Sequence, residues 1–220
     1  MKKTQTGFTL IELAIVLVII GLLLGGVLKG QELINSAKVK NMATDFKNIQ
    51  VYIYGYQDKF RALPGDDRLA STHVTGGTNA TTGGTLGNGV IEGAYNSVTV
   101  TDEAALFWQH VRLAGLAAGP TSTGDANYFP TNADGGRIGV SSVAGNTAIE
   151  VLPTVGGISG AFIICSEGVL GKFAKQLDTA LDDGNTQTGS VRVVTAGAKT
   201  IGLTNVQTLD SNPYVVCMAF

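Results

Sequence analysis

Residues 7–13 read Gly7-Phe8-Thr9-Leu10-Ile11-Glu12-Leu13, and the chain continues through uncharged residues as far as Leu28. A helix rises about 1.5 Å per residue, so a helix over 8–28 covers about 30 Å, the thickness of a bilayer's hydrocarbon core. A secretory signal peptide has a shorter apolar core with small residues after it, whereas here Gly7 precedes the apolar run. We therefore expect a membrane-spanning helix that survives processing.

The lysines around this segment indicate its orientation. Lys2 and Lys3 precede the span, and no comparable cluster follows it until Lys38 and Lys40. Because positively charged flanks stay in the cytoplasm, we expect a single-pass protein of the bacterial inner membrane with a cytoplasmic N-terminus. Everything after Lys29 is then periplasmic or beyond.

Glu12 is the one charged residue inside the apolar segment. A carboxylate deep in hydrocarbon costs about 2.5–3.5 kcal/mol on insertion scales, so such a residue normally has a partner. If the chain is cut after Gly7, the new amino group of Phe8 lies one helical turn away, on the same chain or on a neighbouring helix. The alternative is a Glu12 side chain that reaches the headgroups and has no further role.

The leader Lys2-Lys3, the residues from Gly7 to Leu13 and the apolar run resemble the class III leader and N-terminal helix of type IV pilins and type II secretion pseudopilins. This resemblance covers about the first fifth of the chain. It implies cleavage between Gly7 and Phe8 by a prepilin peptidase, N-methylation of Phe8 and assembly of the helix into the core of a helical filament of like or unlike subunits. It also implies that Glu12 pairs with the Phe8 amine of the adjacent subunit.

One residue departs from the pattern of the family. Most major pilins have a proline twenty-one residues after the first mature residue, where this chain has Lys29. This difference slightly favours a minor pilin or a pseudopilin over a major pilin. Glycines at positions 21, 25, 26 and 30 provide either flexibility or close helix packing, and the sequence leaves both interpretations open.

The helix is expected to continue beyond the membrane. Apolar residues recur at alternating spacings of four and three, which places them on one stripe of a helix: Met42, Phe46, Ile49, Ile53, Tyr56 and Phe60. Pro64-Gly65-Asp66-Asp67 is expected to end this helix. The predicted organisation is a leader over 1–7, a transmembrane or filament-core helix over 8–29, and one globular domain over 30–220 that includes the lower half of the helix.

The rest of the chain predicts an α+β domain in which an antiparallel sheet packs against the long N-terminal helix, in agreement with the pilin fold that the resemblance implies. Residues 71–89 are almost all Thr, Gly and Asn and are expected to form an exposed loop. We expect helices over 101–113 and 167–181, the first capped by Thr101-Asp102-Glu103, and strands over 160–165, 190–195 and 214–219.

Cys165 and Cys217 are the only two cysteines, and each lies in a predicted strand after the membrane span. An oxidising periplasm favours a disulfide between them, which would attach the C-terminal strand, and two buried free thiols are the alternative. The pair also resembles the C-terminal disulfide loop of many pilins.

The motifs of common enzymes are missing from the sequence. It has no P-loop, no Gly-x-Ser-x-Gly elbow and no His-Glu-x-x-His helix, and we expect neither catalysis nor a cofactor. His73 and His110 are too few and too far apart for a triad or a zinc site, so structural roles are expected.

Acidic residues near the second helix are candidate ligands for calcium. Asp178, Asp182 and Asp183 supply hard oxygen ligands of the kind that this ion prefers, but EF-hand spacing is missing. A cap and turn after the helix is the favoured interpretation of Asp182-Asp183-Gly184-Asn185.

The net charge of the chain indicates whether a nucleic acid is an expected partner. Loss of Lys2 and Lys3 with the leader leaves thirteen basic against seventeen acidic residues, a net charge of −4, so no specific nucleic-acid binding is expected. The expected function is therefore a structural subunit of a type IV pilus on the cell surface or of a periplasmic type II secretion pseudopilus. The alternative is a membrane-tethered periplasmic binding or enzymatic domain.

Overall fold

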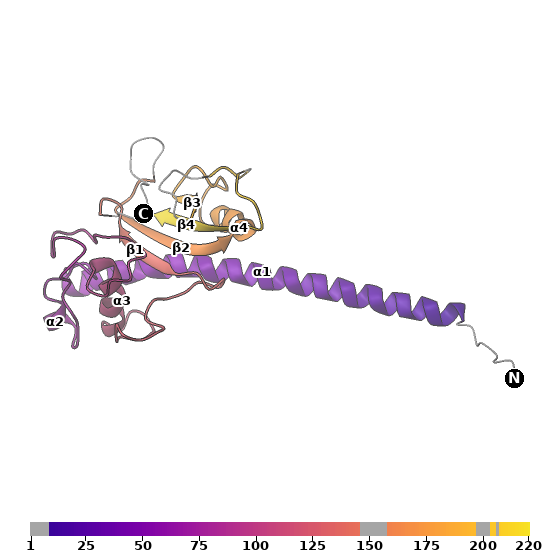
Figure 1. Ribbon diagram of the computed structural model, residues 1–220, viewed down its shortest axis with the longest axis horizontal. Coiled ribbons are helices and arrows are strands. Elements are labelled where there is room, and N and C mark those ends of the chain that lie inside the picture. Colours follow the sequence, from indigo (N-terminus) through magenta and orange to yellow (C-terminus); the bar gives the residue numbers. More distant parts are fainter. Residues whose placement is uncertain (1–8, 146–157, 197–202, 206) are drawn as a thin grey trace. The chain divides into compact units, whose positions relative to one another are not determined.

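A computed structural model describes residues 9–145, 158–196, 203–205 and 207–220 (Figure 1). The described elements are, in chain order, α1 (Leu10–Phe60), α2 (Ala70–His73), α3 (Glu103–Leu113), β1 (Ile138–Ser142), β2 (Phe162–Leu170), α4 (Gly171–Leu181), β3 (Val191–Thr195) and β4 (Pro213–Ala219). The chain divides into two compact units, Met1–Lys38 and Val39–Phe220. The expected α+β class is confirmed.

The long helix predicted from the apolar pattern is present as α1, which runs without a break through 51 residues. Five residues of the predicted stripe are buried in the second unit, namely Met42, Phe46, Ile49, Ile53 and Tyr56, and the sixth, Phe60, is half-buried. Val39, which was not predicted, is also buried. The helix ends at Phe60, where Arg61 takes a left-handed conformation with φ of 56°.

The sheet is antiparallel with the strand order β1-β2-β4-β3. One hydrophobic core joins it to α1, α3 and α4, and includes Phe46 and Ile53 from α1, Phe107 from α3 and Phe173 from α4. In the second unit, α1 therefore lies at the centre of the domain and the sheet covers its buried stripe (Figure 1).

The boundary between β2 and α4 differs from the prediction. The sequence predicted a strand ending at Cys165 and a helix beginning at Glu167, but β2 continues to Leu170 and α4 begins only at Gly171. The pairing of β2 with β4 shifts register between Ser166 and Val169, where Gly168 has a φ of 67°. This bulge lets the strand continue through residues whose apolar spacing had suggested a helix.

The other predicted elements have mixed outcomes. The C-terminal strands agree with β3 and β4, whereas the sequence did not predict β1 or the short α2. Most side chains of the predicted loop over 71–89 are exposed, but the amides of Gly87, Asn88 and Gly89 all donate hydrogen bonds to the buried Asp66 carboxylate. The middle of the loop is also attached, because the Thr78 amide donates to Gln109 Oε1 at 2.9 Å, so the loop is fixed to the domain at more than one point.

The capping predicted for the helix over 101–113, which is α3, is correct in position only. Asp102 is the N-cap residue of α3, but its side chain makes no capping hydrogen bond. Its carboxylate accepts hydrogen bonds from the hydroxyls of Thr82 and Ser97 instead, both at 2.5 Å.

Candidate functional site

The start of α1 contains a reciprocal set of hydrogen bonds between Thr9 and Glu12. The Thr9 amide and the Thr9 hydroxyl donate to Glu12 Oε2 at 2.8 and 2.7 Å, and the Glu12 amide donates to Thr9 Oγ1 at 3.3 Å. This arrangement is a capping box, in which an N-cap Thr and a Glu three residues later satisfy each other's free amides. The pattern Thr-x-x-Glu is visible in the sequence, but the prediction considered only the Phe8 amine as a partner for Glu12.

Gly7 and Phe8, the predicted cleavage and methylation residues, lie outside the described residues, as do Lys2 and Lys3. The predicted pairing of Glu12 with the Phe8 amine therefore stays a prediction. Within the described residues, the hydrogen bonds to the Glu12 carboxylate all use Oε2.

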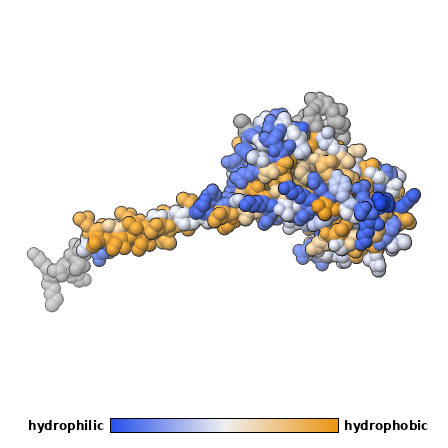
Figure 2. All heavy atoms as spheres, turned by 180° about the vertical axis from the view of Figure 1, so that it is seen from behind, coloured by the Kyte–Doolittle hydropathy of each residue, from blue (hydrophilic) through white to orange (hydrophobic). Residues whose placement is uncertain are grey.

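The first part of α1 is an exposed apolar surface, visible as the orange part of the helix in Figure 2. The large side chains from Leu10 to Leu28 are between 46% and 88% exposed. By length and composition, this helix is long and apolar enough to cross a membrane. An apolar surface this large is stable only against lipid or other apolar side chains.

The glycines of this segment have open surroundings. A Cβ atom at Gly21, Gly25, Gly26 or Gly30 would meet no atom within 4 Å. The helix also stays regular at Lys29, whose ammonium group pairs with Glu32 at 2.7 Å. Nothing in the described chain therefore requires glycine at these four positions.

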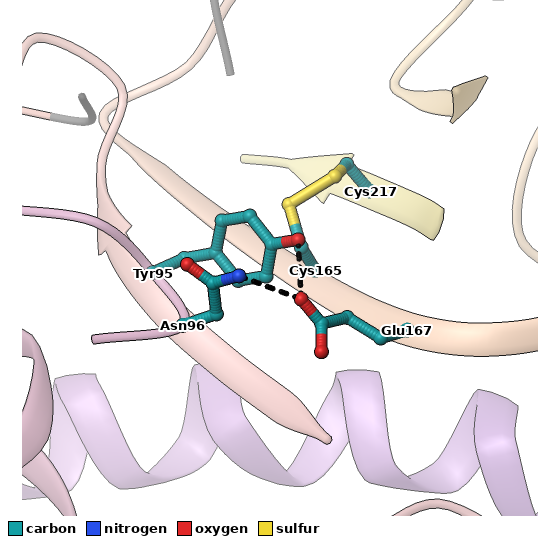
Figure 3. The surroundings of a disulfide bond; sticks show 5 residues. All are labelled: Tyr95, Asn96, Cys165, Glu167 and Cys217. Carbon is teal, nitrogen blue, oxygen red and sulfur yellow. Dashed lines mark hydrogen bonds between the residues drawn. A yellow bond between two sulfur atoms is a disulfide. The ribbon is translucent and has the colours of Figure 1, made fainter. Parts of the chain in front are cut away.

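The predicted disulfide is present between Cys165 of β2 and Cys217 of β4, which lie opposite each other in the antiparallel register (Figure 3). It closes a sequence separation of 52 residues. Beside it, the Tyr95 hydroxyl and the Asn96 amide donate to Glu167 Oε1 at 2.9 and 2.7 Å, which ties the segment before α3 to the bulge of β2. The disulfide thus attaches β4, the last strand, to the middle of the sheet.

The two histidines have the structural surroundings that the sequence predicted. His110 is buried, its Nδ1 accepts from the Gly65 amide at 2.9 Å, and its Nε2 lies 2.8 Å from the Thr78 carbonyl. Burial lowers the pKa of His110, so the neutral ring is favoured. Both ring nitrogens are occupied, which leaves no position for a metal ion.

His73 has a different neighbour, the buried carboxylate of Asp67. Its Nδ1 lies 2.6 Å from Asp67 Oδ2, which also accepts the Tyr56 hydroxyl at 2.8 Å. Burial acts to raise the pKa of Asp67, but the hydrogen bonds from His73 and Tyr56 outweigh it and hold this pKa below its usual value. Asp67 and His73 line a cavity of about 440 Å³ at the end of α1.

The predicted calcium candidates do come together. One carboxylate oxygen from each of Asp178, Asp182 and Asp183 lies within 4.8 Å of the others. Asp178 is in the last turn of α4, and Asp182 is the C-cap residue of that helix. The arrangement is also that of the predicted cap and turn, since Gly184 has a φ of 81°.

Comparison with known proteins gives one match. Residues 2–28 match the family model of the prokaryotic N-terminal methylation motif. No curated protein and no solved structure matches the chain. The matched segment contains Glu12 and ends with the exposed apolar part of α1. The chain therefore carries the N-terminal motif that is the hallmark of type IV pilins and pseudopilins.

Proposed function

We propose that this protein is a structural, non-enzymatic subunit of a type IV pilus or a type II secretion pseudopilus. The observation that carries the proposal is the methylation motif over residues 2–28, whose apolar helix is uncovered from Leu10 to Leu28. This surface needs one apolar environment before assembly and another afterwards, and the inner membrane and a bundle of equivalent helices provide them. A prepilin peptidase and other pilin or pseudopilin subunits are the partners that this function requires.

Processing and orientation form part of the proposal. A prepilin peptidase cuts between Gly7 and Phe8 on the cytoplasmic side and methylates the Phe8 amine. Residues 8–29 then form the membrane or filament-core segment, and residues 30–220 form the periplasmic or surface domain. Lys2 and Lys3 support this orientation, because positive flanks remain in the cytoplasm.

Glu12 is the assembly residue in this proposal. Its capping box holds the carboxylate over the first turn of α1, close to the amide of Thr9 and hence to the residue that carries the new N-terminus. Oε1 then pairs with the Phe8 amine of an adjacent subunit while Oε2 remains with Thr9. This pair neutralises both charges in a surrounding of apolar helices, where an unpaired charge is costly.

Lys29 supports a minor pilin or a pseudopilin over a major pilin. Its position corresponds to the proline of most major pilins, and here the helix passes through it without a break. A subunit of low abundance is the expected consequence.

Mass spectrometry of sheared filaments and of the membrane fraction tests this function. The mature protein is expected to begin with N-methylated Phe8 and to be scarce in the filament fraction compared with the major subunit. A wild-type protein that still begins at Met1 would contradict the proposal and favour the tethered domain. An abundant filament protein would instead indicate a major pilin.

Two substitutions separate processing from assembly. Gly7→Ala is expected to accumulate uncut precursor, whereas Glu12→Ala is expected to be cut normally but to be lost from the filament fraction. Glu32→Ala is the matched control, because Glu32 lies on the same helix, is exposed and pairs only with Lys29 among the described residues. Normal assembly of Glu12→Ala would remove the assigned role of Glu12.

A further inference from the structure

We propose that the cavity at the end of α1 binds an anionic saccharide, that is, a sugar chain that carries carboxylate groups. Its volume of about 440 Å³ is within the range of about 300–1,000 Å³ that is usual for small-molecule sites. All the residues that line it belong to the globular unit, so the site does not depend on filament assembly. Cationic, polar and apolar side chains meet there: Gln57, Phe60, Arg61, Arg68, Leu69 and His73.

The two carboxylates at the cavity are already engaged within the chain. Asp66 accepts hydrogen bonds from the three backbone amides of residues 87–89. Asp67 accepts from the Tyr56 hydroxyl at 2.8 Å and lies 2.6 Å from His73 Nδ1. Because groups of the protein itself already bind these negative charges, the charged groups that remain for a ligand are the two arginines. The cavity therefore favours an anion over a cation.

Arg68 supplies one of the two positive charges. Its side chain lines the cavity and is exposed, and its guanidinium makes no hydrogen bond or ion pair within the described residues. A Cβ atom at position 87 would lie only 3.1 Å from Arg68 Cδ, so Gly87 makes room for the stem of this arginine. A guanidinium with unused donors can bind a carboxylate through two parallel hydrogen bonds, which is the geometry that the planar group prefers.

Arg61 supplies the second positive charge from an unfavourable backbone position. It follows the last residue of α1, has a φ of 56°, and is the one non-glycine residue with a positive φ among those that the structure describes. Glycine usually occupies this position after a helix, because a Cβ atom is unfavourable in the left-handed conformation. In the described chain, Arg61 forms one ion pair, with the exposed Asp58 at 4.0 Å, which is too weak to explain an arginine here. A role of the side chain in binding explains it.

His73 and Gln57 add groups that suit the hydroxyls of a sugar. Asp67 occupies His73 Nδ1, so Nε2 is the ring nitrogen that remains for a ligand, and the side chain is 24% exposed. Nε2 accepts a hydrogen bond from a hydroxyl when the ring is neutral and donates one when it is charged, and the Gln57 amide can do both. The cavity thus combines groups for a carboxylate with groups for hydroxyls.

The apolar part of the lining separates a saccharide from a simple anion. Phe60 is half-buried and stacks on His73 with ring centroids 5.2 Å apart, and Leu69 is 51% exposed. The carbon-bound hydrogens of a sugar ring can pack on such side chains, whereas an inorganic anion has no apolar surface. The volume is also much larger than an inorganic anion needs. A sugar with carboxylates uses all three kinds of group in the cavity.

The test uses the full-length protein in detergent micelles and three probes. Isothermal titration with digalacturonate is expected to show one site per chain with a dissociation constant of about 0.1–1 mM. Digalactose, the matched disaccharide without carboxylates, and inorganic phosphate are each expected to bind at least about tenfold more weakly. Absence of digalacturonate binding would overturn the proposal. Equally strong binding of phosphate would overturn the assignment to a saccharide, and equally strong binding of digalactose would overturn the role of the charge.

Substitutions of the two arginines identify the site. Arg68→Gln and Arg61→Gly are each expected to weaken digalacturonate binding by about tenfold and to leave digalactose binding unchanged, because only contacts to the carboxylate are lost. Arg61→Gly is also expected to keep or raise Tm, because glycine adopts the left-handed conformation without strain.

Lys47→Gln is the matched control for these variants. It also removes one positive charge from an exposed position on α1, but Lys47 does not line the cavity. Full affinity in both arginine variants, or an equal loss of affinity in Lys47→Gln, would overturn the site. A clear fall in the Tm of Arg61→Gly would show that Arg61 supports the fold, and would overturn its role in binding.

Discussion

The two parts of α1 belong to one uninterrupted helix but have opposite surroundings. From Leu10 to Leu28 its large apolar side chains are exposed, whereas from Val39 to Tyr56 an apolar stripe is buried in the core of the globular unit. In the second part, the stripe accounts for the stability of the chain's own domain. In the first part, equally apolar residues contribute nothing to that domain and must be explained by an environment outside the chain. Hydrophobicity alone therefore does not separate a folding surface from an assembly surface, but its distribution around the helix does.

The largest expected difference between the two parts of α1 lies in how much the truncation of a large side chain lowers the free energy of unfolding. Phe46→Ala removes a ring that is 1% exposed, and it is expected to lower the free energy of unfolding by about 3–5 kcal/mol. Leu17→Ala, at a position 69% exposed, is expected to change the free energy of unfolding by less than about 0.5 kcal/mol. Chemical denaturation of the full-length protein in micelles, followed by Trp108 fluorescence, measures both. Equal effects would mean that the first part of α1 also packs within its own chain.

The disulfide is expected to stabilise only the globular unit. Replacement of both Cys165 and Cys217 by Ser removes the constraint across 52 residues and is expected to cost about 2–4 kcal/mol. Circular dichroism during denaturation should show the sheet lost at lower denaturant while the helical signal of the membrane segment remains. Simultaneous loss of both signals would contradict the independence of the two parts of α1.

The next largest expected effect is a pH dependence of stability that Glu103 causes. Burial first, and then the nearby charges of Asp66, Glu92 and Asp102, raise the pKa of Glu103 to about 7, and its Oε1 has no hydrogen-bond partner in the described structure. Because the folded state holds a proton that the unfolded state has already lost, stability is expected to fall as pH rises from about 4.5 to 7. The slope reaches about 1 kcal/mol per pH unit.

Glu103→Gln isolates this contribution. The variant cannot ionise, so its stability relative to the wild type is expected to increase between about pH 4.5 and 7 and then to become constant. The difference between the two proteins removes the background from Asp178, whose pKa is also raised to about 7. A pH-independent difference in unfolding free energy would show that Glu103 ionises normally in the folded protein.

The sequence predicted both parts of α1, but a different pattern predicted each part. The alternating four and three spacing from Met42 to Phe60 predicted the buried stripe, because a helix that packs on one side leaves a periodic pattern. The uniform apolar run before it predicted exposure to lipid or other helices, because a periodic pattern is then unnecessary. The paired cysteines and the C-terminal strands were also predictable, since β-rich apolar segments flank both cysteines.

The failures share a physical cause, which is that local pattern does not reveal tertiary pairing. β1 reads Ile138-Gly-Val-Ser-Ser, and its five residues are buried although two of them are serines. Its strand conformation depends on pairing with β2, which the sequence does not show locally. Leu170 fitted a helical spacing but ends β2 instead. Likewise, Asp178 was a candidate ligand by proximity alone, and its burial emerged only with the fold.

The smallest expected effect concerns the glycines of the first part of α1. A Cβ atom at Gly25 would meet nothing within 4 Å, so Gly25→Ala is expected to raise the stability of the isolated helix by up to about 1 kcal/mol through helix propensity. In the globular unit, the same change at Gly171 would place a Cβ atom 2.1 Å from the Leu209 carbonyl oxygen and is expected to destabilise the domain. If neighbouring helices pack closely at Gly25, the Gly25→Ala chain will fold and insert normally but appear less in sheared filaments. Unchanged filament yield would mean that these glycines do not mediate close packing, and would leave helix flexibility as the remaining interpretation.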